Sequence, residues 1–185
     1  MLRIVYTATM EQHTEEWKQY ELYPCYWVSN HGRVKRLYKN ANEKYLKPCV
    51  AHKGYLWIDL VRAPKRIHKM VHVMVAESFI PNPENKPMVD HINEIKDDNR
   101  LENLRWVNNS ENQQNITTLR KSNTSGCVGV ESKKGSSTGI HWAWGAKITL
   151  MGKRIELGYF KKYEDAVQAR RDAEIKYFGE FAPKR

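Results

Sequence analysis

Residues 88–115 of this 185-residue chain hold the side chains best suited to chemistry. Asp90 and His91 are adjacent, and Asn103 and Asn112 follow in the same stretch. Carboxylate and amide oxygens are ligands that a hard divalent cation accepts. Histidine titrates near neutral pH and can take a proton from water, while a bound cation would neutralise a phosphate and stabilise a leaving alkoxide. These residue types allow phosphodiester hydrolysis, although a solvated acidic loop with a structural histidine would have the same composition.

Short elements would have to bring these four side chains onto one metal. We expect two short strands joined by a polar loop, followed by a helix that begins near Asn108, because Glu111 three residues later gives the capping-box spacing. The expected ranges are strand 87–91, loop 92–102, strand 103–107 and helix 108–116.

Strand and helix periodicities lie on both sides of this stretch. Residues 26–38 alternate around Asn30-His31-Gly32, which predicts a hairpin with Gly32 at positive φ. Residues 54–62 predict a strand, and within 66–79 the period changes from that of a strand to that of a helix. A polar, turn-rich segment and then a β-β-β-α unit are expected in the rest of the chain. The ranges are linker 117–126, strands 127–132, 142–150 and 153–160, and a helix 163–178 with Gly179 as its C-cap.

The charge of the chain points to a polyanionic partner. It has 31 Lys and Arg against 21 Asp and Glu, a formal net charge of +10 and a sequence pI of about 9.5. Nucleic acid is the first class of partner that this balance suggests, and an acidic membrane surface is the second. The charge is uneven, being +6 in residues 1–80, −3 in 81–116 and +7 in 117–185.

Other classes of protein are disfavoured. No run approaches the ~20 apolar residues of a transmembrane helix, and the N-terminus lacks the apolar core and cleavage site of a signal peptide. We therefore expect a cytoplasmic protein with no membrane partner. Cys25, Cys49 and Cys127 are far apart and odd in number, which argues against a disulfide framework and a zinc knuckle.

The central stretch resembles the HNH endonucleases of the phage and intron type. The motif positions read VHVMVAESF (residues 71–79), VDH (89–91), NRLENLRWV (99–107) and SEN (110–112). The resemblance implies a ββα-metal fold in which Asp90 and Asn112 ligate one divalent metal. It also implies that His91 is the general base, and that Asn103 hydrogen-bonds across the loop and holds His91 in place.

Asn112 stands where the eponymous pattern has its final histidine, as in a known branch of the family. The implied ligands are one carboxylate and one amide with no soft ligand, which favours Mg²⁺ or Mn²⁺ over Zn²⁺. His72 also matches a family position, but we expect it to pack or hydrogen-bond at the start of a helix and do not count it as a ligand.

Both flanks resemble DNA-binding modules. Residues 16–36 resemble the accessory motif that precedes the nuclease core in many phage and homing HNH enzymes, through Trp17 and the run YWVSNHGRV. The edge of this hairpin would lie along DNA, with Arg33 and Lys35 on one face and Arg36 on the other. An ordinary solvated edge could carry the same basic residues.

Residues 125–182 resemble the plant ethylene-response-factor type of DNA-binding domain, through SGCVGV, LGYF and GEFA. In that family a three-stranded sheet enters the major groove, which a strand pair fits, and a helix supports it from behind. The Arg-rich first strand of the plant domain is absent here, so base specificity is not carried over, and Trp144 suits a core position as well as a contact. The expected DNA contacts are Lys133, Lys134, Trp142, Lys147, Lys153 and Arg154.

The predicted fold class is α+β, with a ββα-metal HNH nuclease core, N-terminal β-hairpins and a small C-terminal β-β-β-α DNA-binding domain. The predicted ranges are an N-terminal accessory region 1–65, the nuclease core 66–117, a linker 118–126 and the C-terminal domain 127–185.

The predicted function is a metal-dependent endonuclease of phage or homing type that nicks double-stranded DNA, because one metal site cleaves one strand. The alternative is a non-catalytic, sequence-specific DNA-binding protein on an HNH scaffold. RNA binding is weaker still, because the A-form major groove is too narrow to read. Monomer and weak dimer both stay open, and the expected location is the host bacterial cytoplasm if a phage encodes the protein.

Overall fold

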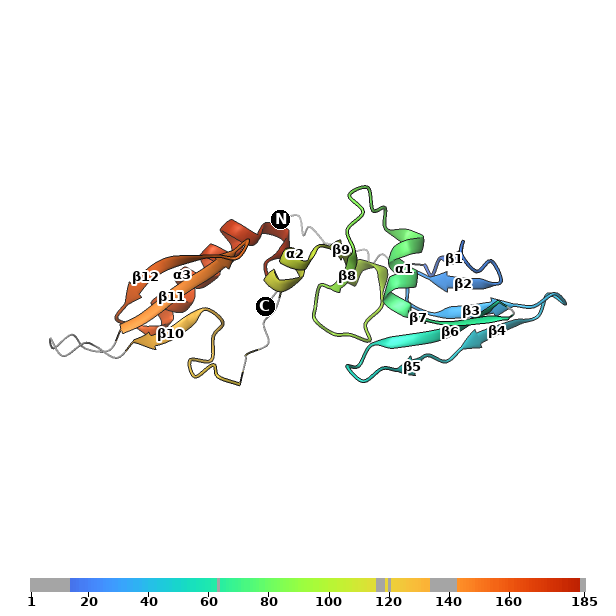
Figure 1. Ribbon diagram of the computed structural model, residues 1–185, viewed down its shortest axis with the longest axis horizontal. Helices are drawn as coiled ribbons and strands as arrows, with labels where there is room; N and C mark the ends of the chain where they lie inside the picture. The colour runs from blue at the N-terminus through green and yellow to red at the C-terminus, as the bar shows by residue number, and fades with distance from the viewer. Residues whose placement is uncertain (1–13, 63, 116–118, 120, 134–142, 184–185) are drawn as a thin grey trace, which may run out of the picture. The chain divides into compact units, whose positions relative to one another are not determined.

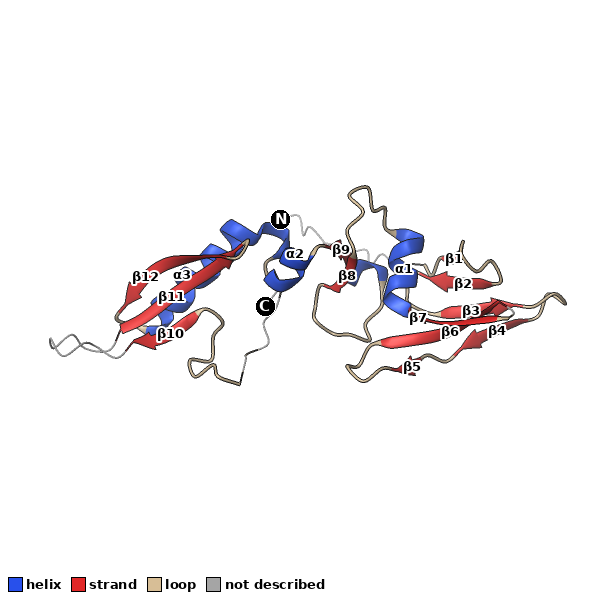
Figure 2. Ribbon diagram, viewed as in Figure 1, coloured by secondary structure: helices blue, strands red, loops and turns tan. Residues whose placement is uncertain are grey.

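The computed structural model describes residues 14–62, 64–115, 119, 121–133 and 143–183. These residues form several small antiparallel sheets and few helices, which confirms the α+β class (Figures 1 and 2). The chain divides into two compact units, one of Met1–Ile80 with Asn99–Leu101 and the other of Pro81–Asp98 with Glu102–Arg185. The predicted domain ranges follow motifs rather than compactness, and they stay a prediction.

The first unit contains two antiparallel sheets and one helix. One sheet has the order β1-β2-β3-β4 and the other the order β5-β6-β7, and helix α1 follows β7 without a break. The elements are β1 (Trp17–Gln19), β2 (Tyr26–Ser29), β3 (Val34–Leu37), β4 (Glu43–Leu46), β5 (Cys49–Val50), β6 (Leu56–Arg62), β7 (Lys65–Met70) and α1 (Val71–Phe79).

The hairpin predicted around Asn30-His31-Gly32 is confirmed as the β2–β3 pair. Gly32 has a φ of 77°, and an added Cβ would lie 2.7 Å from Cβ of Asn99. The Leu101 amide donates to the Asn30 carbonyl at 2.7 Å. Glycine is therefore required here for two reasons, a left-handed backbone and a close approach by another segment.

The core of the first unit lies between α1 and the two sheets. Val71, Met74 and Val75 of α1 are fully buried, and α1 packs against β1, β2, β6 and β7. The hydroxyl of Tyr26 accepts a hydrogen bond from the Val61 amide at 2.8 Å, which ties one sheet to the other. The predicted change from strand to helix within 66–79 is confirmed by the junction of β7 and α1.

The second unit begins with a two-stranded ribbon and a short helix. Strand β8 (Met88–His91) pairs antiparallel with β9 (Leu104–Val107), and α2 (Asn109–Gln114) follows directly. The loop between the strands ends in a 3₁₀ turn, Leu101–Asn103. Both strands and the helix were expected at these places.

A three-stranded antiparallel sheet backed by a helix forms the rest of the second unit. Its elements are β10 (Val130–Lys133), β11 (Ala143–Leu150), β12 (Lys153–Phe160), α3 (Tyr163–Phe178) and a 3₁₀ turn, Gly179–Phe181. Two buried clusters hold α3 to the sheet, one around Ala146 and Ala166 and one around Ile148, Ala173 and Phe178. Trp144 packs against the first cluster, so it has the core position.

In the part of the chain that the structure describes, no helix combines the length and the apolar character needed to cross a membrane.

Candidate active site

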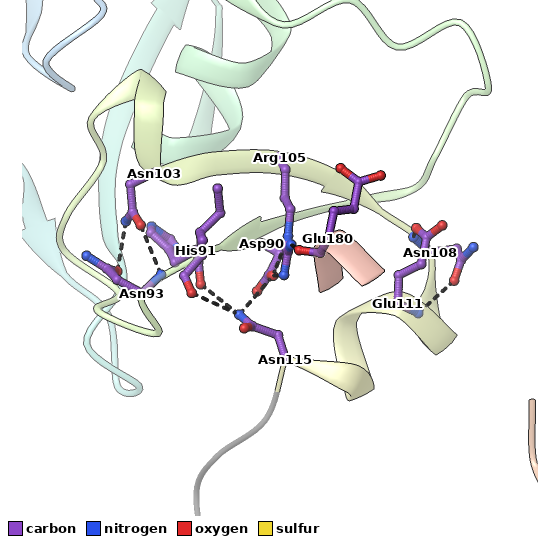
Figure 3. A network of polar contacts seen from close by, with 10 residues as sticks. Asp90, His91, Asn93, Asn103, Arg105, Asn108, Glu111, Asn115 and Glu180 are labelled. Atoms are coloured by element: carbon purple, nitrogen blue, oxygen red, sulfur yellow. Dashed lines mark hydrogen bonds and ion pairs between the residues drawn. The ribbon is translucent and has the colours of Figure 1, made fainter. Parts of the chain in front are cut away.

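The β8–β9 ribbon places Asp90 and His91 at the end of a strand (Figure 3). Asp90 lies opposite Arg105 in the register, and His91 lies opposite Leu104. His91 is only 4% exposed. The backbone then turns, with the Glu94 amide donating to the His91 carbonyl at 2.9 Å, so His91 is the last residue of its strand.

One oxygen of Asp90 is held by two neighbours. Its Oδ2 accepts hydrogen bonds from Nε and Nη2 of Arg105 at 3.1 and 3.0 Å, and from Nδ2 of Asn115 at 3.1 Å. No described residue donates to Oδ1. Burial raises the pKa of Asp90 above its usual value, although Arg105, His91 and Asn115 act in the opposite direction. The carboxylate therefore has one fixed oxygen and one available oxygen.

Asn103 spans the loop that follows His91. Its Oδ1 accepts from the Asn93 amide at 3.0 Å, and its Nδ2 donates to Oδ1 of Asn93 at 2.9 Å and to the Asp98 carbonyl at 2.8 Å. The Asn103 carbonyl accepts from the Ile92 amide at 2.9 Å. These contacts fix the backbone next to His91, and the role of Asn103 in holding His91 stays a prediction.

Helix α2 is short, and its start is fixed by a capping box. Oδ1 of Asn108 accepts from the Glu111 amide at 2.9 Å, and Oε2 of Glu111 accepts from the Asn108 amide at 2.8 Å. The ammonium group of Lys86 lies 3.0 Å from Oε1 of Glu111. Burial acts to raise the pKa of Glu111, but the bond from Asn108 and the charge of Lys86 lower it overall. The box predicted from Asn108 and Glu111 is confirmed.

An asparagine at the far end of α2 contacts the ribbon. Asn115 is the C-cap and is 3% exposed, and it donates to Asp90 and to the His91 carbonyl, both at 3.1 Å. Asn112 lies three residues earlier and so on the same side of the helix. Its side chain is half-buried and has no hydrogen-bond partner among the described residues.

This donor set suits a hard cation. Asp90 offers a carboxylate oxygen and Asn112 an amide oxygen, both of the type that Mg²⁺ and Mn²⁺ accept. Within the described residues, no cluster of three or more His, Cys, Asp or Glu could hold a metal, so a site would need the amide and water. The structure joins Asp90 to Arg105 and Asn115, and no hydrogen bond joins it to Asn112.

The basic residues expected to contact DNA on the N-terminal hairpin lie on two faces. The Lys35 ammonium and the Arg33 guanidinium lie 4.6 and 5.8 Å from the ring centre of Trp17. Arg36 lies instead 5.3 Å from the ring centre of Tyr26. The two faces agree with the alternation expected for a strand.

The C-terminal candidates lie on the sheet and its hairpin. Lys153 and Arg154 are exposed, and Lys147 is half-buried. Lys134 and Trp142 lie outside the described residues, as does the side chain of Lys133. Four of the expected contacts on the two modules are ion-paired within the chain, as Arg33–Glu15, Lys35–Glu43, Lys147–Glu131 and Arg154–Glu156.

Sequence reasoning missed Arg105 and Asn115. Arg105 could have been found by pairing VDH against LRWV in an antiparallel register, which sets it opposite Asp90. Asn115 could have been found from its three-residue spacing to Asn112 on a helix.

Comparisons with known proteins identify the family. The HNH endonuclease family matches residues 69–114, from the end of β7 through α2. DNA endonuclease I-HmuI of Bacillus phage SP01 is 36% identical over 123 residues, which cover 64% of this chain and 69% of that protein. The chain belongs to the HNH endonuclease family. The HNH match includes Asp90, His91, Asn103 and Asn112, and it ends one residue before Asn115.

Further similarities extend beyond the HNH segment. The NUMOD4 motif matches residues 15–61 and confirms the accessory motif before the HNH core. Two uncharacterised HNH endonucleases of Acanthamoeba polyphaga mimivirus are 39% identical over 127 residues and 37% identical over 87 residues. These alignments cover 62% and 47% of this chain but only 30% and 26% of the two viral proteins.

One solved structure is also similar to this HNH chain. It describes DNA binding and cleavage by the HNH homing endonuclease I-HmuI, with 38% identity, a TM-score of 0.49, and coverage of 54% of this chain and 56% of that one. The likeness of residues 125–182 to ethylene-response-factor domains lies outside the two matched family ranges and stays a prediction.

Proposed function

We propose that this chain is a divalent-metal-dependent endonuclease that nicks double-stranded DNA. The observation that carries the proposal is the position of Asp90 and His91 at the end of β8, inside the segment that matches HNH endonucleases, with Asn115, the C-cap of α2, hydrogen-bonded to the Asp90 carboxylate and the His91 carbonyl. A relative that is 36% identical is named a DNA endonuclease.

The roles of the side chains follow from their chemistry. Asp90, through Oδ1, and Asn112, through its amide oxygen, would hold Mg²⁺ or Mn²⁺. When bound, the ion supplies charge neutralisation at the phosphate and at the leaving oxygen. His91 takes a proton from the attacking water, and Asn103 fixes the loop backbone beside it.

The number of catalytic sites in each chain determines whether one or both DNA strands are cut. Each chain has one Asp90–His91 pair, so one chain cuts one strand, and a double-strand cut needs a second chain or a second event. Double-stranded DNA is the proposed partner, bound by the basic segments 1–80 and 117–185, whose net charges are +6 and +7.

A plasmid assay tests the proposal. Wild type, His91→Ala and Asp90→Ala are incubated with supercoiled DNA and Mg²⁺ or Mn²⁺, beside His52→Ala, which changes an exposed histidine. We expect open circles from wild type and His52→Ala, and a rate at least about 100-fold lower from His91→Ala, because it lacks the general base.

Two results would contradict it. If wild type and His91→Ala are equally inert while both bind DNA, the chain is a non-catalytic DNA-binding protein. If linear DNA forms without an open-circle intermediate, the chain does not nick.

A further inference from the structure

Arg105 connects the candidate nuclease site to the turn that follows α3. Its Nε and Nη2 donate to Oδ2 of Asp90, and its Nη1 donates to the Glu180 carbonyl at 2.6 Å. The guanidinium also lies 4.7 Å from the ring centre of Phe181. Figure 3 shows Arg105 between Asp90 and Glu180.

The ring of Phe181 also lies against this guanidinium. The ammonium of Lys86 lies 5.3 Å from the same ring centre and also pairs with Glu111. The ring of Phe181 therefore contacts two cationic side chains from outside its own element. A cation over an aromatic face is attracted to it. The side chain of Arg105 is 13% exposed and that of Asp90 is 11% exposed. The contact is therefore mostly shielded from water, unlike a mobile surface ion pair.

The pattern of bonds is selective for one oxygen of Asp90. Nε and Nη2 of Arg105 and Nδ2 of Asn115 all donate to Oδ2. A carboxylate held in this way cannot rotate freely, and its second oxygen keeps a fixed direction. Hydrogen-bonded partners of ligating side chains orient them and raise metal affinity.

We propose that Arg105, braced by the turn Gly179–Phe181, is a positioning residue that directs Oδ1 of Asp90 to the divalent cation. The inference rests on the proposed function, because it requires Asp90 to be a ligand. It means that a segment beyond the matched HNH range contributes to the metal site of this chain.

Two substitutions in the full chain separate orientation from charge and from stability. Arg105→Lys keeps the positive charge but loses the planar donor pair, and Phe181→Ala removes the brace without touching Asp90. Mn²⁺ affinity is measured by the electron paramagnetic resonance signal of the free ion. We expect it to fall about 10- to 100-fold in Arg105→Lys and about two- to five-fold in Phe181→Ala.

The controls distinguish positioning from a general loss of structure. Phe181→Tyr keeps the ring and should restore wild-type Mn²⁺ affinity, and Arg171→Lys makes the same change as Arg105→Lys at an exposed position of α3. DNA affinity without divalent cation should stay within about two-fold for Phe181→Ala, since no phosphate-binding charge is lost. If Arg105→Lys does not fold, the comparison of Phe181→Ala with Phe181→Tyr still tests the positioning role.

The possible outcomes separate this inference from the proposed function. If Asp90→Ala loses Mn²⁺ binding while Arg105→Lys and Phe181→Ala bind as tightly as wild type, the positioning role is wrong and the metal site stands. If wild type binds Mn²⁺ no better than Asp90→Ala, the metal site is wrong and the positioning role with it.

Discussion

Asn103 shows how much one uncharged side chain can determine in a polar loop. It uses its amide oxygen once as an acceptor and its amide nitrogen twice as a donor, on Asn93 and Asp98. At 7% exposure, water has little access to replace any of these bonds. The conformation of the loop after His91 therefore depends on one side chain that both donates and accepts hydrogen bonds.

Asn103→Asp tests this dependence with a change that preserves shape. The new oxygen would face the Asp98 carbonyl and Oδ1 of Asn93, both acceptors. We expect the free energy of unfolding to fall by about 1–3 kcal/mol, the cost of leaving buried polar groups without partners, as measured by denaturant unfolding. Asn109→Asp makes the same change at an exposed position of α2 and should stay within about 0.5 kcal/mol of wild type. Equal effects of the two substitutions would show that the bonds of Asn103 have no special weight.

The sequence indicates which side chains form the site more readily than which residues contact them. The stretch VDH with two later asparagines indicated Asp90, His91, Asn103 and Asn112 without any coordinates. Which residue touches Asp90 depends on strand register, and a shift by one residue would turn Arg105 to the other face. Short strands with few buried apolar side chains specify that register only weakly, so Arg105 can be placed opposite Asp90 from the sequence only if the pairing of VDH with LRWV is assumed.

The β2–β3 hairpin is an element whose turn requires glycine for two separable reasons. Gly32→Ala adds both a left-handed backbone penalty and a clash with Asn99. Gly152→Ala adds only the first, because Gly152 also has positive φ, 76°, and no atom lies within 4 Å of the added Cβ. The left-handed penalty is about 1–2 kcal/mol. We expect Gly32→Ala to cost clearly more than that and Gly152→Ala to cost no more.

Hydrogen exchange reports on the two substitutions separately. The amides of β2–β3 measure the destabilisation by Gly32→Ala, and the amides of β11–β12 measure the destabilisation by Gly152→Ala. If both substitutions reduce protection equally, the approach of Asn99 to the turn has no energetic weight.

Tyr20 ties the segment after β1 to helix α1 in a way that depends on pH. It is 2% exposed, and its hydroxyl donates to Oε2 of Glu77 at 2.5 Å. Burial and then the bond to Glu77 raise the pKa of Tyr20 well above its ordinary 10.0. The folded state thus retains this proton at a pH where the unfolded state has lost it. The stabilisation is complete below pH ~10 and is lost as pH rises further, by about 1.4 kcal/mol per pH unit.

Comparison of wild type with Tyr20→Phe isolates this contribution. The difference in unfolding free energy should be constant from pH 8 to 9 and should shrink above pH ~10, measured by denaturant unfolding at each pH. Curves that stay parallel above pH ~10 would exclude Tyr20 as the source of the dependence.

Elements with a strong local signal could be predicted, and short edge strands could not. The change of period within 66–79 and the capping box of α2 both had such signals. Strands β4 and β5 had none, because Glu43–Leu46 is mostly exposed and Cys49–Val50 has two residues. In α3, Ala166 and Ala173 are buried as in an amphipathic helix, but Arg170 and Glu174 are also buried.

That burial depends on partners that a helical pattern does not show. Arg170 pairs with Glu174 at 3.1 Å and donates to the Val128 carbonyl at 3.1 Å. A periodicity analysis counts both side chains as outward because they are charged. Only the fold brings the carbonyl within reach of the guanidinium and makes their burial favourable.

The net charge of +10 overstates how many cations are available to DNA. Arg33, Lys35, Lys147 and Arg154 all pair with carboxylates of the same chain. Such pairs are worth about 0–1 kcal/mol when exposed to solvent, so a phosphate can displace the carboxylate at little cost. On DNA binding, these four side chains would exchange a carboxylate partner for a phosphate. Lys153 pairs with no described residue, so a phosphate would be its first ionic partner.

Salt dependence can count the contacts of the β11–β12 hairpin. Each phosphate contact contributes about 0.9 to the slope of log affinity against log salt concentration. If Lys153 and Arg154 each bind a phosphate, the full-length double variant Lys153→Gln, Arg154→Gln should lower that slope by about 2, as measured by fluorescence anisotropy with labelled duplex DNA. Lys176→Gln removes one exposed charge from α3, the element that packs behind the sheet, and should leave the slope unchanged. Because both variants lower the net charge, an equal change in both would indicate a diffuse charge effect. An unchanged slope in the double variant would remove this hairpin from the DNA-binding surface.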